Sequence, residues 1–179
     1  MGNDPLRKMD IHTLQISTDV IKMEDKEKFA YMAGLIDGEG TITFVKRGSK
    51  YPGKFIIRVI VVGTSKELFD WISKEFGGTT DITKVGERKA KIQSTQDMYY
   101  WYITTQKAVS LLRECYPFLV IKKRQAELIF EYAQTIQKTT VPLTQELIGK
   151  RQGIYQKLRD LHKGRGRNQV PFISENTLI

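Results

Sequence analysis

The chain has 179 residues, of which 40% are hydrophobic, and this composition is sufficient for one domain with a buried core. A small disulfide-stapled scaffold and a disordered tail are therefore excluded. Lysine and arginine number 29 against 20 aspartates and glutamates, so the net charge of +9 favours nucleic acid or an anionic membrane as partner. Residues 41–125 hold 16 basic and 7 acidic side chains, whereas the rest holds 13 of each, which predicts one cationic face.

Cysteine and histidine are scarce. Cys115 has no partner for an internal disulfide, and His12 and His162 cannot complete a structural zinc site with it. No apolar run approaches the roughly 18 residues of a membrane span, and the N-terminus has no secretory or myristoylation pattern. We therefore expect a soluble protein in a reducing compartment, either the cytoplasm or nucleoid of a prokaryote or the interior of an organelle.

The first predicted helix follows an irregular N-terminal arm, residues 1–24. From Asp25, a candidate N-cap, apolar residues recur at helical spacing until Gly38 and Gly40 end the helix. Ala30, Ala33 and Gly34 leave one flank of this helix almost without side chains, which suits close packing against another helix.

The next elements alternate between strands and helices. Residues 41–47 and 54–62 have the composition of strands joined by a turn-rich link, which predicts a hairpin. Residues 66–78 follow as a helix that ends at two glycines, and a less regular second hairpin is expected over 79–105.

Helices are expected in the last third of the chain. Residues 106–116 form a short apolar segment that Pro117 interrupts, and 122–136 resume as an amphipathic helix. Residues 144–162 are expected to form the last helix, with Thr144 as a candidate cap.

Two carboxylates, Asp37 and Glu39, lie among glycines at the end of the first helix, where the helix dipole repels anions. A cation that compensates them would explain their placement. The string 32–40 resembles the motif of the LAGLIDADG homing endonucleases. It matches at Ala33, Gly34, Leu35, Ile36, Asp37 and Gly40, with Met32 for the first Leu, Gly38 for Ala and Glu39 for the second Asp.

A second segment, 117–126 with the sequence PFLVIKKRQA, is similar to the stretch of this family that leads to a catalytic lysine. The resemblance implies an α+β fold of the order αββαββα with a DNA-binding antiparallel saddle. The domain would cover 25–162, with its core over 25–136 and its C-terminal helix at about 144–162. Residues 163–179 remain as a basic, irregular tail.

The resemblance implies a site-specific, intron-encoded endonuclease that cuts both strands of a long, pseudo-palindromic DNA by phosphodiester hydrolysis. Glu39 takes the place of the metal ligand, with a backbone carbonyl near Gly38 as a further ligand. Mg²⁺ is the implied cofactor; we expect Mn²⁺ to substitute for it and Ca²⁺ to support binding without cleavage. Lys122 matches the active-site lysine, and Lys123 is the fallback.

One departure from the family concerns a glutamine and an arginine that some single-motif relatives carry after the second strand. Neither is present in 62–66, and Lys66 is the candidate replacement for the arginine. Asp37 fits the role of a helix-terminating residue. Because the chain has one motif copy, the resemblance implies a homodimer whose motif helices pack across a two-fold axis, through Ala30, Ala33, Gly34 and Asp37.

The strands are expected to read double-stranded DNA through the major groove. Period-two alternation places one set of first-hairpin side chains on one face, with Lys50 in the turn: Thr41, Thr43, Val45, Arg47, Lys54 and Arg58. The opposite, core face would carry Phe55, Ile57, Val59 and Val61. In the second hairpin the candidates are Thr83, Arg88, Lys91 and Gln93, while Tyr100, Trp101 and Tyr102 are expected to pack between sheet and helices.

Two alternatives remain open at this point. An intron RNA maturase on the same fold would assist splicing without cleaving DNA, and a DNA-binding regulator would bind a site without nicking it. Neither reading includes a membrane partner or a small-molecule substrate. The acidic Glu39 at the ligand position favours cleavage over both.

Overall fold

The computed structural model describes residues 23–48, 50–85, 95–137 and 142–163. The elements follow one another as α1 (Asp25–Glu39), β1 (Gly40–Lys46), β2 (Phe55–Gly63), α2 (Lys66–Phe76), β3 (Thr79–Thr83), β4 (Met98–Thr104), α3 (Thr105–Cys115), η2 (Tyr116–Phe118), α4 (Lys123–Gln134) and α5 (Gln145–Lys163). The α+β class and the predicted order of helices and hairpins are confirmed. None of the described helices is long and apolar enough to cross a membrane.

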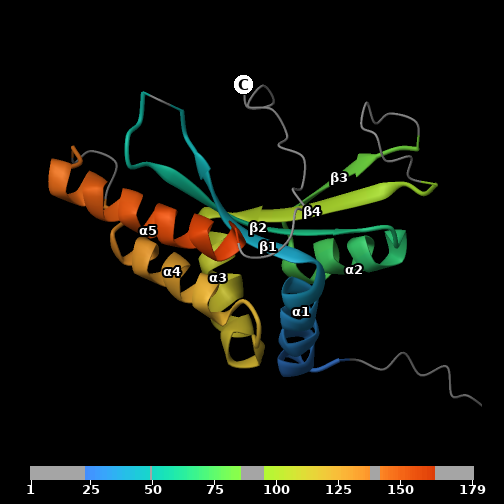
Figure 1. Cartoon of the computed structure of the whole chain (residues 1–179). Coiled ribbons are helices and arrows are strands. Elements are labelled where there is room, and N and C mark those ends of the chain that lie inside the picture. The colour runs from blue at the N-terminus through green and yellow to red at the C-terminus, as the bar shows by residue number, and fades with distance from the viewer. Residues whose placement is uncertain (1–22, 49, 86–94, 138–141, 164–179) are drawn as a thin grey trace, which may run out of the picture.

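The four strands form one antiparallel sheet in the order β1-β2-β4-β3. β2 and β4 are therefore the central strands, and the hairpin connections place β1 and β3 at the edges. All described helices lie on one side of the sheet, and the hairpin ends curve away from them to leave a concave second side (Figure 1).

We call this second side the open face. Residues directly opposite each other in an antiparallel pair share a face, so the pairing register of the strands assigns the members of the open face. They are Thr41, Thr43 and Val45 of β1; Ile56, Arg58, Ile60 and Val62 of β2; Met98, Tyr100, Tyr102 and Thr104 of β4; and Thr79, Asp81 and Thr83 of β3.

The other side of the sheet, the helix-covered face, forms the core. Ile57, Val59 and Val61 of β2 are at most 1% exposed, which confirms the predicted core face, and Trp101 of β4 is fully buried beside them. Phe55 is only partly buried, because it lies nearer the hairpin end, where its ring stacks on Tyr155 of α5.

Two helix ends show how the sequence sets boundaries. α1 is capped by Glu24, which forms a reciprocal capping box with Glu27, so the expected cap at Asp25 is wrong by one residue. The helix also continues through Gly38 and ends at Glu39. At α5 the expected cap is confirmed, because the Thr144 hydroxyl accepts a hydrogen bond from the Leu147 amide at 3.2 Å.

α5 packs against the turn of the β1–β2 hairpin. A Cβ on Gly53, in the hairpin turn, would lie 3.1 Å from the Cα of Ile148, so glycine permits the close approach of turn and helix. Arg151 of α5 is 4% exposed, and its guanidinium donates to the carbonyl of Gly53 and to Thr135. The hairpin that carries Lys50 and Lys54 is thus held by the helix layer.

Candidate functional site

The C-terminus of α1 meets the N-terminus of α4 through a reciprocal set of hydrogen bonds, which we call the α1–α4 junction. The Asp37 carboxylate accepts from the amides of Val120, Ile121 and Lys122 at 2.7, 3.1 and 2.8 Å. The Lys122 ammonium donates to the carbonyls of Ile36 and Asp37 at 2.7 and 2.5 Å. Each helix end therefore receives a side chain of the charge that its dipole favours.

The electrostatics of Asp37 follow from these contacts. Partial burial by itself raises the pKa of its carboxyl, but the three amide donors and the Lys122 ammonium outweigh this effect and hold the pKa below its ordinary value. The Asp37 carboxylate is therefore stabilised as an anion by groups of its own chain. Its carboxylate thus accepts from the start of α4, whereas α1 itself continues to Glu39. The helix-terminating role and the place of Asp37 in a dimer contact stay predictions.

Glu39 is the last residue of α1, and its side chain is exposed. It makes no ion pair or hydrogen bond with any residue in the described part of the chain. The next residue must be glycine, since a Cβ on Gly40 would lie 2.6 Å from the Cα of Ile36. The tight passage from α1 into β1 thus leaves Glu39 exposed, two residues after the Asp37 carbonyl that Lys122 contacts.

The donor set of one chain is incomplete for a metal ion. No group of three or more histidine, cysteine, aspartate or glutamate side chains lies together among the described residues, and Asp37 is already engaged. Glu39 and nearby carbonyls are hard oxygen donors of the type that Mg²⁺ prefers. Such an ion fits here with further oxygen ligands from beyond the described residues of one chain.

Lys66 begins α2 just after β2. Its ammonium forms an ion pair with Asp70 on the same helix at 2.5 Å, and that hydrogen bond raises the pKa of Lys66. Both side chains are more than 60% exposed, so the pair is a weak restraint. The catalytic role of Lys66 stays a prediction.

One flank of α1, which we call the free flank, carries Gly34 and Gly38. Both glycines are exposed, and a Cβ on either would meet no atom within 4 Å. Tyr31, one turn earlier, is 47% exposed, and its ring packs edge-on against Trp71 of α2. Ala33, by contrast, is fully buried in the core. Its side chain is therefore not available for the contact with another helix that the sequence predicted. Ala30 is partly buried between the two flanks.

The open face gathers the side chains predicted to read DNA from the first hairpin. Thr43 lies opposite Arg58, and Thr41 and Val45 share their side, so the predicted common face is confirmed. At the hairpin end the Arg47 and Lys54 cations lie over the Tyr51 ring, 5.6 and 5.5 Å from its centroid. DNA contact by these residues remains a prediction.

The remaining DNA candidates are more scattered. Lys50 is exposed in the hairpin turn, and Thr83 lies on the open face through its pairing with Met98. Arg88, Lys91 and Gln93 lie outside the described residues.

The three neighbouring aromatic residues of β4 divide between the two faces, which sequence reasoning missed. Trp101 packs in the core as expected, but Tyr100 and Tyr102 project to the open face opposite Val62 and Ile60. The Arg58 guanidinium lies 4.9 Å from the centroid of the Tyr102 ring. Strand alternation was the available signal, since neighbours in a strand cannot share a face.

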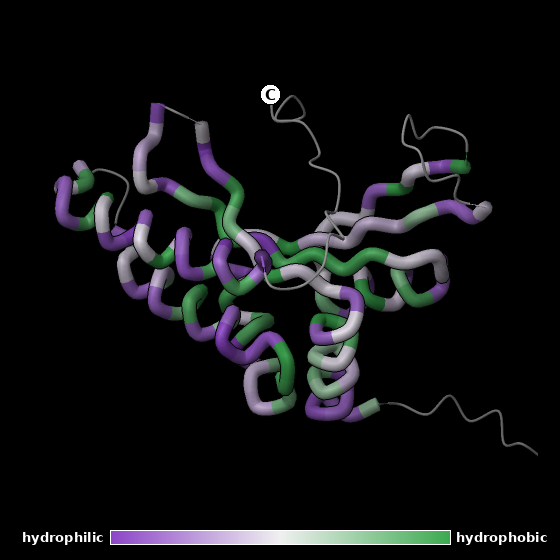
Figure 2. Tube along the Cα trace, in the orientation of Figure 1, coloured by the Kyte–Doolittle hydropathy of each residue, from purple (hydrophilic) through white to green (hydrophobic). Residues whose placement is uncertain are grey.

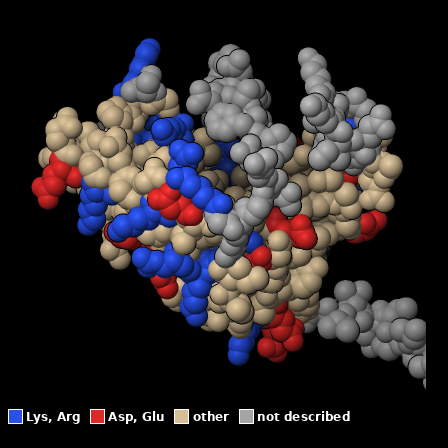
Figure 3. All heavy atoms as spheres, in the orientation of Figure 1, with Lys and Arg blue, Asp and Glu red and all other residues tan. Residues whose placement is uncertain are grey.

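Charge is distributed more widely than the segment count predicted. Lysine and arginine side chains extend from the β1–β2 hairpin over α5 and α4 on the viewed side, with acidic groups among them (Figure 3). Exposed cations of α5, such as Lys157 and Arg159, thus add to those of 41–125. The cationic surface is built by the fold and not by one segment.

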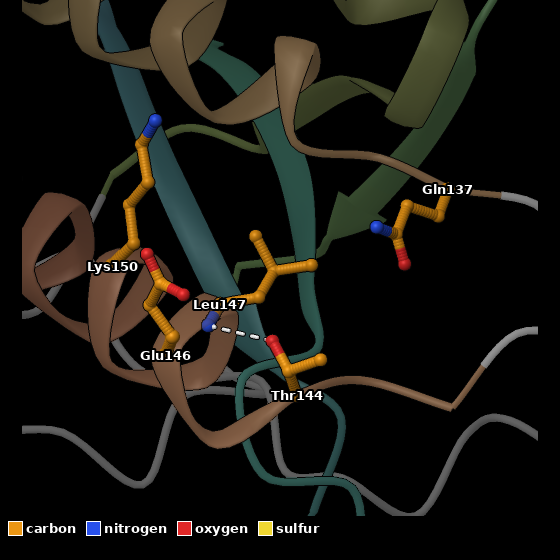
Figure 4. Close-up of a pocket in the computed structure, with 5 residues that line it drawn as sticks. All are labelled: Gln137, Thr144, Glu146, Leu147 and Lys150. Carbon is orange, nitrogen blue, oxygen red and sulfur yellow. Dashed lines mark hydrogen bonds between the residues drawn. The ribbon is translucent and has the colours of Figure 1, made fainter.

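A surface hollow of about 280 Å³ lies at the start of α5, far along that helix from α1 (Figures 1 and 4). Gln137, Glu146, Leu147 and Lys150 line it, together with Thr144, whose hydroxyl is occupied by the α5 cap. It contains none of the residues predicted to carry chemistry.

Comparison with known proteins identifies solved structures with the same fold but no protein of closely similar sequence. No family model and no curated protein matches the sequence. The structure is similar to that of the homing endonuclease I-CvuI in complex with its target in the presence of calcium, with 21% identity, a TM-score of 0.60, and coverage of 80% of this chain and 87% of that one. I-CvuI in complex with the I-CreI target in the presence of magnesium, with the DNA not cleaved, gives a TM-score of 0.59 at 21% identity, covering 78% of this chain and 85% of that one.

The homing endonuclease I-TnaI is similar too, at 16% identity with a TM-score of 0.52, covering 76% of this chain and 96% of that one. The chain therefore has the fold of the LAGLIDADG homing endonucleases. The resemblance expected from 32–40 and 117–126 is confirmed at this level.

Proposed function

We propose that the chain is a site-specific DNA endonuclease of the homing type, which cuts both strands of a long, pseudo-palindromic target in a Mg²⁺-dependent hydrolysis. The observation that carries this proposal is the α1–α4 junction. Lys122 is fixed there on the carbonyls of Ile36 and Asp37, and Glu39, exposed and without an ion pair among the described residues, follows two residues after Asp37, directly before β1. The adjoining sheet carries basic side chains on its open face. The resemblance in the two motif segments further supports an intron-encoded gene.

Glu39, Lys122 and Asp37 have different proposed roles. Glu39 would hold the metal, and Mg²⁺ bound there would polarise the scissile phosphate and lower the pKa of an attacking water. Lys122 places a positive charge beside this point and fixes the C-terminus of α1, so it favours the approach of the phosphate. Asp37 acts indirectly, because it holds the start of α4 and with it Lys122.

The incomplete metal site supports a homodimer. Packing of two free flanks would let two α1 helices approach at Gly34 and Gly38, where no side chain intervenes. Two Glu39 carboxylates, together with DNA phosphate oxygens, would then supply the ligands that one chain lacks. One strand would be cut beside each Glu39, which yields a double-strand break.

The open face is the proposed DNA surface. β2 has nine residues, a length of roughly 30 Å, and this corresponds to roughly nine base pairs along DNA. Two copies would cover about twice that length. The target is therefore long, and the two-fold symmetry of the dimer makes it pseudo-palindromic.

A binding selection followed by cleavage tests the proposal. Random double-stranded DNA is selected by the native protein in Ca²⁺, and the enriched site is cloned into a plasmid. We expect the native protein to linearise this plasmid in Mg²⁺ or Mn²⁺, and Glu39→Gln to bind it with similar affinity while cleaving at least about 10³-fold more slowly.

Glu114→Gln is the matched control, because Glu114 is an exposed glutamate on α3. It should cleave like the native chain. Selective binding without cleavage in Mg²⁺ or Mn²⁺ would contradict the endonuclease and point to a regulator. Failure to enrich any DNA sequence, with binding to an intron RNA, would point to a maturase.

A further inference from the structure

The open face is unusually rich in hydrocarbon for a sheet surface without helices. On β2 it carries Ile56, Ile60 and Val62, each partly exposed. The hydropathy trace accordingly shows β2 as a mostly hydrophobic strand through the middle of the sheet (Figure 2). A strand with one wet face normally alternates between apolar and polar residues, whereas one that is apolar on both faces is usually covered on both.

From Ile60 to the hairpin turn, this hydrocarbon is arranged in rows that alternate with positive charge, while Val62, paired with Tyr100, lies beyond Ile60 at the other end of the strand. The pairing of Gly40 with Val61 places the end of β2 that holds Ile60 nearest to Glu39. Moving away from that end, the first row is Ile60 with Thr41, and the second is Arg58 with Thr43. The third row is Ile56 with Val45, and the fourth is Lys54 with Arg47, whose backbones are hydrogen bonded at the start of the hairpin turn.

The spacing of the rows suits duplex DNA. Side chains on one face of a strand recur every second residue, about 6.6 Å apart, which corresponds to roughly two base pairs. Apolar and basic rows thus alternate at intervals that a major groove can match. The basic rows give the surface the charge that phosphates require, so an uncharged apolar partner is a poor fit.

The major groove offers one apolar group, the methyl of thymine, and aliphatic side chains contact it, whereas arginine and lysine bind guanine. We propose that the Ile60–Thr41 and Ile56–Val45 rows recognise thymine methyls in each half of the target, with the Arg58 row between them. This rests on the proposed function and deepens it, because it names the bases that the site must carry. RNA offers neither feature, since uracil lacks the methyl and the A-form major groove is too narrow to admit a sheet.

Deoxyuridine substitution tests the proposal by removing the methyl and nothing else. Target duplexes are obtained by selection with the native protein in Ca²⁺, and each thymine is replaced in turn by deoxyuridine. We expect thymine to be enriched in two blocks per half-site. Replacement within a block should raise the Kd about fourfold for each methyl, the amount expected for one buried methyl, and replacement elsewhere should leave it unchanged.

Protein variants assign each block to a row. Ile60→Thr keeps a β-branched side chain but reduces the hydrocarbon, and it should abolish the thymine preference at the block nearer the cleavage site. Ile56→Thr should abolish it at the outer block. The matched control is Ile82→Thr on β3, because Ile82 is 51% exposed but lies opposite Tyr99, away from the open face.

The outcomes separate this inference from the proposed function. A selected target without thymine at either block, or a Kd that changes less than twofold on every deoxyuridine replacement, would overturn the methyl readout while leaving a DNA-specific protein. Failure to select any DNA would overturn both proposals. Retained thymine preference in both threonine variants would also reject the assignment to these rows.

Discussion

The two faces of the sheet are made by the same strands but differ in what holds their side chains. On the helix-covered face Ile57, Val59 and Trp101 are enclosed by helices and nearly inaccessible. On the open face Ile60 and Arg58 keep exposed surface, and the Arg58 guanidinium lies over the Tyr102 ring of the same face. Because the side chains of the helix-covered face are buried, we expect substitutions there to lower the free energy of unfolding. We expect substitutions on the open face to affect mainly the binding of a partner.

α1 repeats this division along a single helix. Met32, Ala33 and Ile36 are buried in the core, while Gly34 and Gly38 are exposed on the free flank. The junction combines both properties, because Lys122 is 8% exposed and bonded to the carbonyl of Asp37, two residues before the exposed Glu39. Substitutions can therefore ask whether stability and activity separate as the two kinds of surface suggest.

Lys122 provides the strongest test, since it would serve both purposes. Lys122→Met should lower the cleavage rate by about 10²- to 10³-fold through loss of the charge near the phosphate. It should also lower the free energy of unfolding by about 1–2 kcal/mol, because two carbonyls lose their donor. Cleavage kinetics and denaturant unfolding measure the two effects, and Lys122→Arg is the charge-conserving control. Native cleavage by Lys122→Met would limit Lys122 to a structural role.

Paired substitutions on β2 compare the two faces directly. Ile57→Ala should lower the free energy of unfolding by about 3 kcal/mol, because it leaves a cavity in the core. Ile60→Ala, on the open face, should lower it by less than about 1 kcal/mol. Urea titration followed by circular dichroism measures both. Equal losses would mean that the open face also carries stability.

The free flank of α1 can be examined with a bulky residue. Gly34→Leu should leave folding of the chain intact, because open space surrounds that position, but it should weaken self-association at least about tenfold. Sedimentation equilibrium measures the association. Gly153→Leu on α5 is the matched control, since Gly153 is also exposed with open space around it. Unchanged association in Gly34→Leu would reject this flank as the dimer contact.

The smallest effect is expected for a substitution at the start of α5, far from the proposed cleavage site. Thr144→Ala removes the cap of α5 and should lower the free energy of unfolding by about 1 kcal/mol without changing cleavage. Thermal unfolding and the plasmid assay check the two parts. Thr144→Ser retains the hydroxyl and should behave like the native chain. A loss of cleavage in Thr144→Ala alone would show that α5 is coupled to the site.

Local patterns were sufficient to predict the elements of the fold. Helical spacing, strand alternation and glycine stops each act within a few residues, and the predicted first-hairpin face, with Thr43 beside Arg58, followed from alternation alone. The Glu24 cap was missed because a glutamate pair can cap a helix as well as the aspartate that follows it. Errors of this size are confined to element ends.

Features that depend on how distant elements pack could not be predicted from local sequence patterns. The burial of Ala33 depends on which flank of α1 packs on the core, and a flank of small residues does not specify that. The side of Tyr102 depends on the register between β2 and β4, which are separated by a helix and a third strand. The contacts between Asp37 and Lys122 join two motif segments that no local pattern connects.

Those contacts also constrain how the molecule assembles. Asp37 and Lys122 are 85 residues apart, and the whole sheet lies between them in the chain. Closing so long a segment is entropically unfavourable until the intervening strands have paired. We therefore expect the junction to form late in folding, after the strands of the sheet have paired.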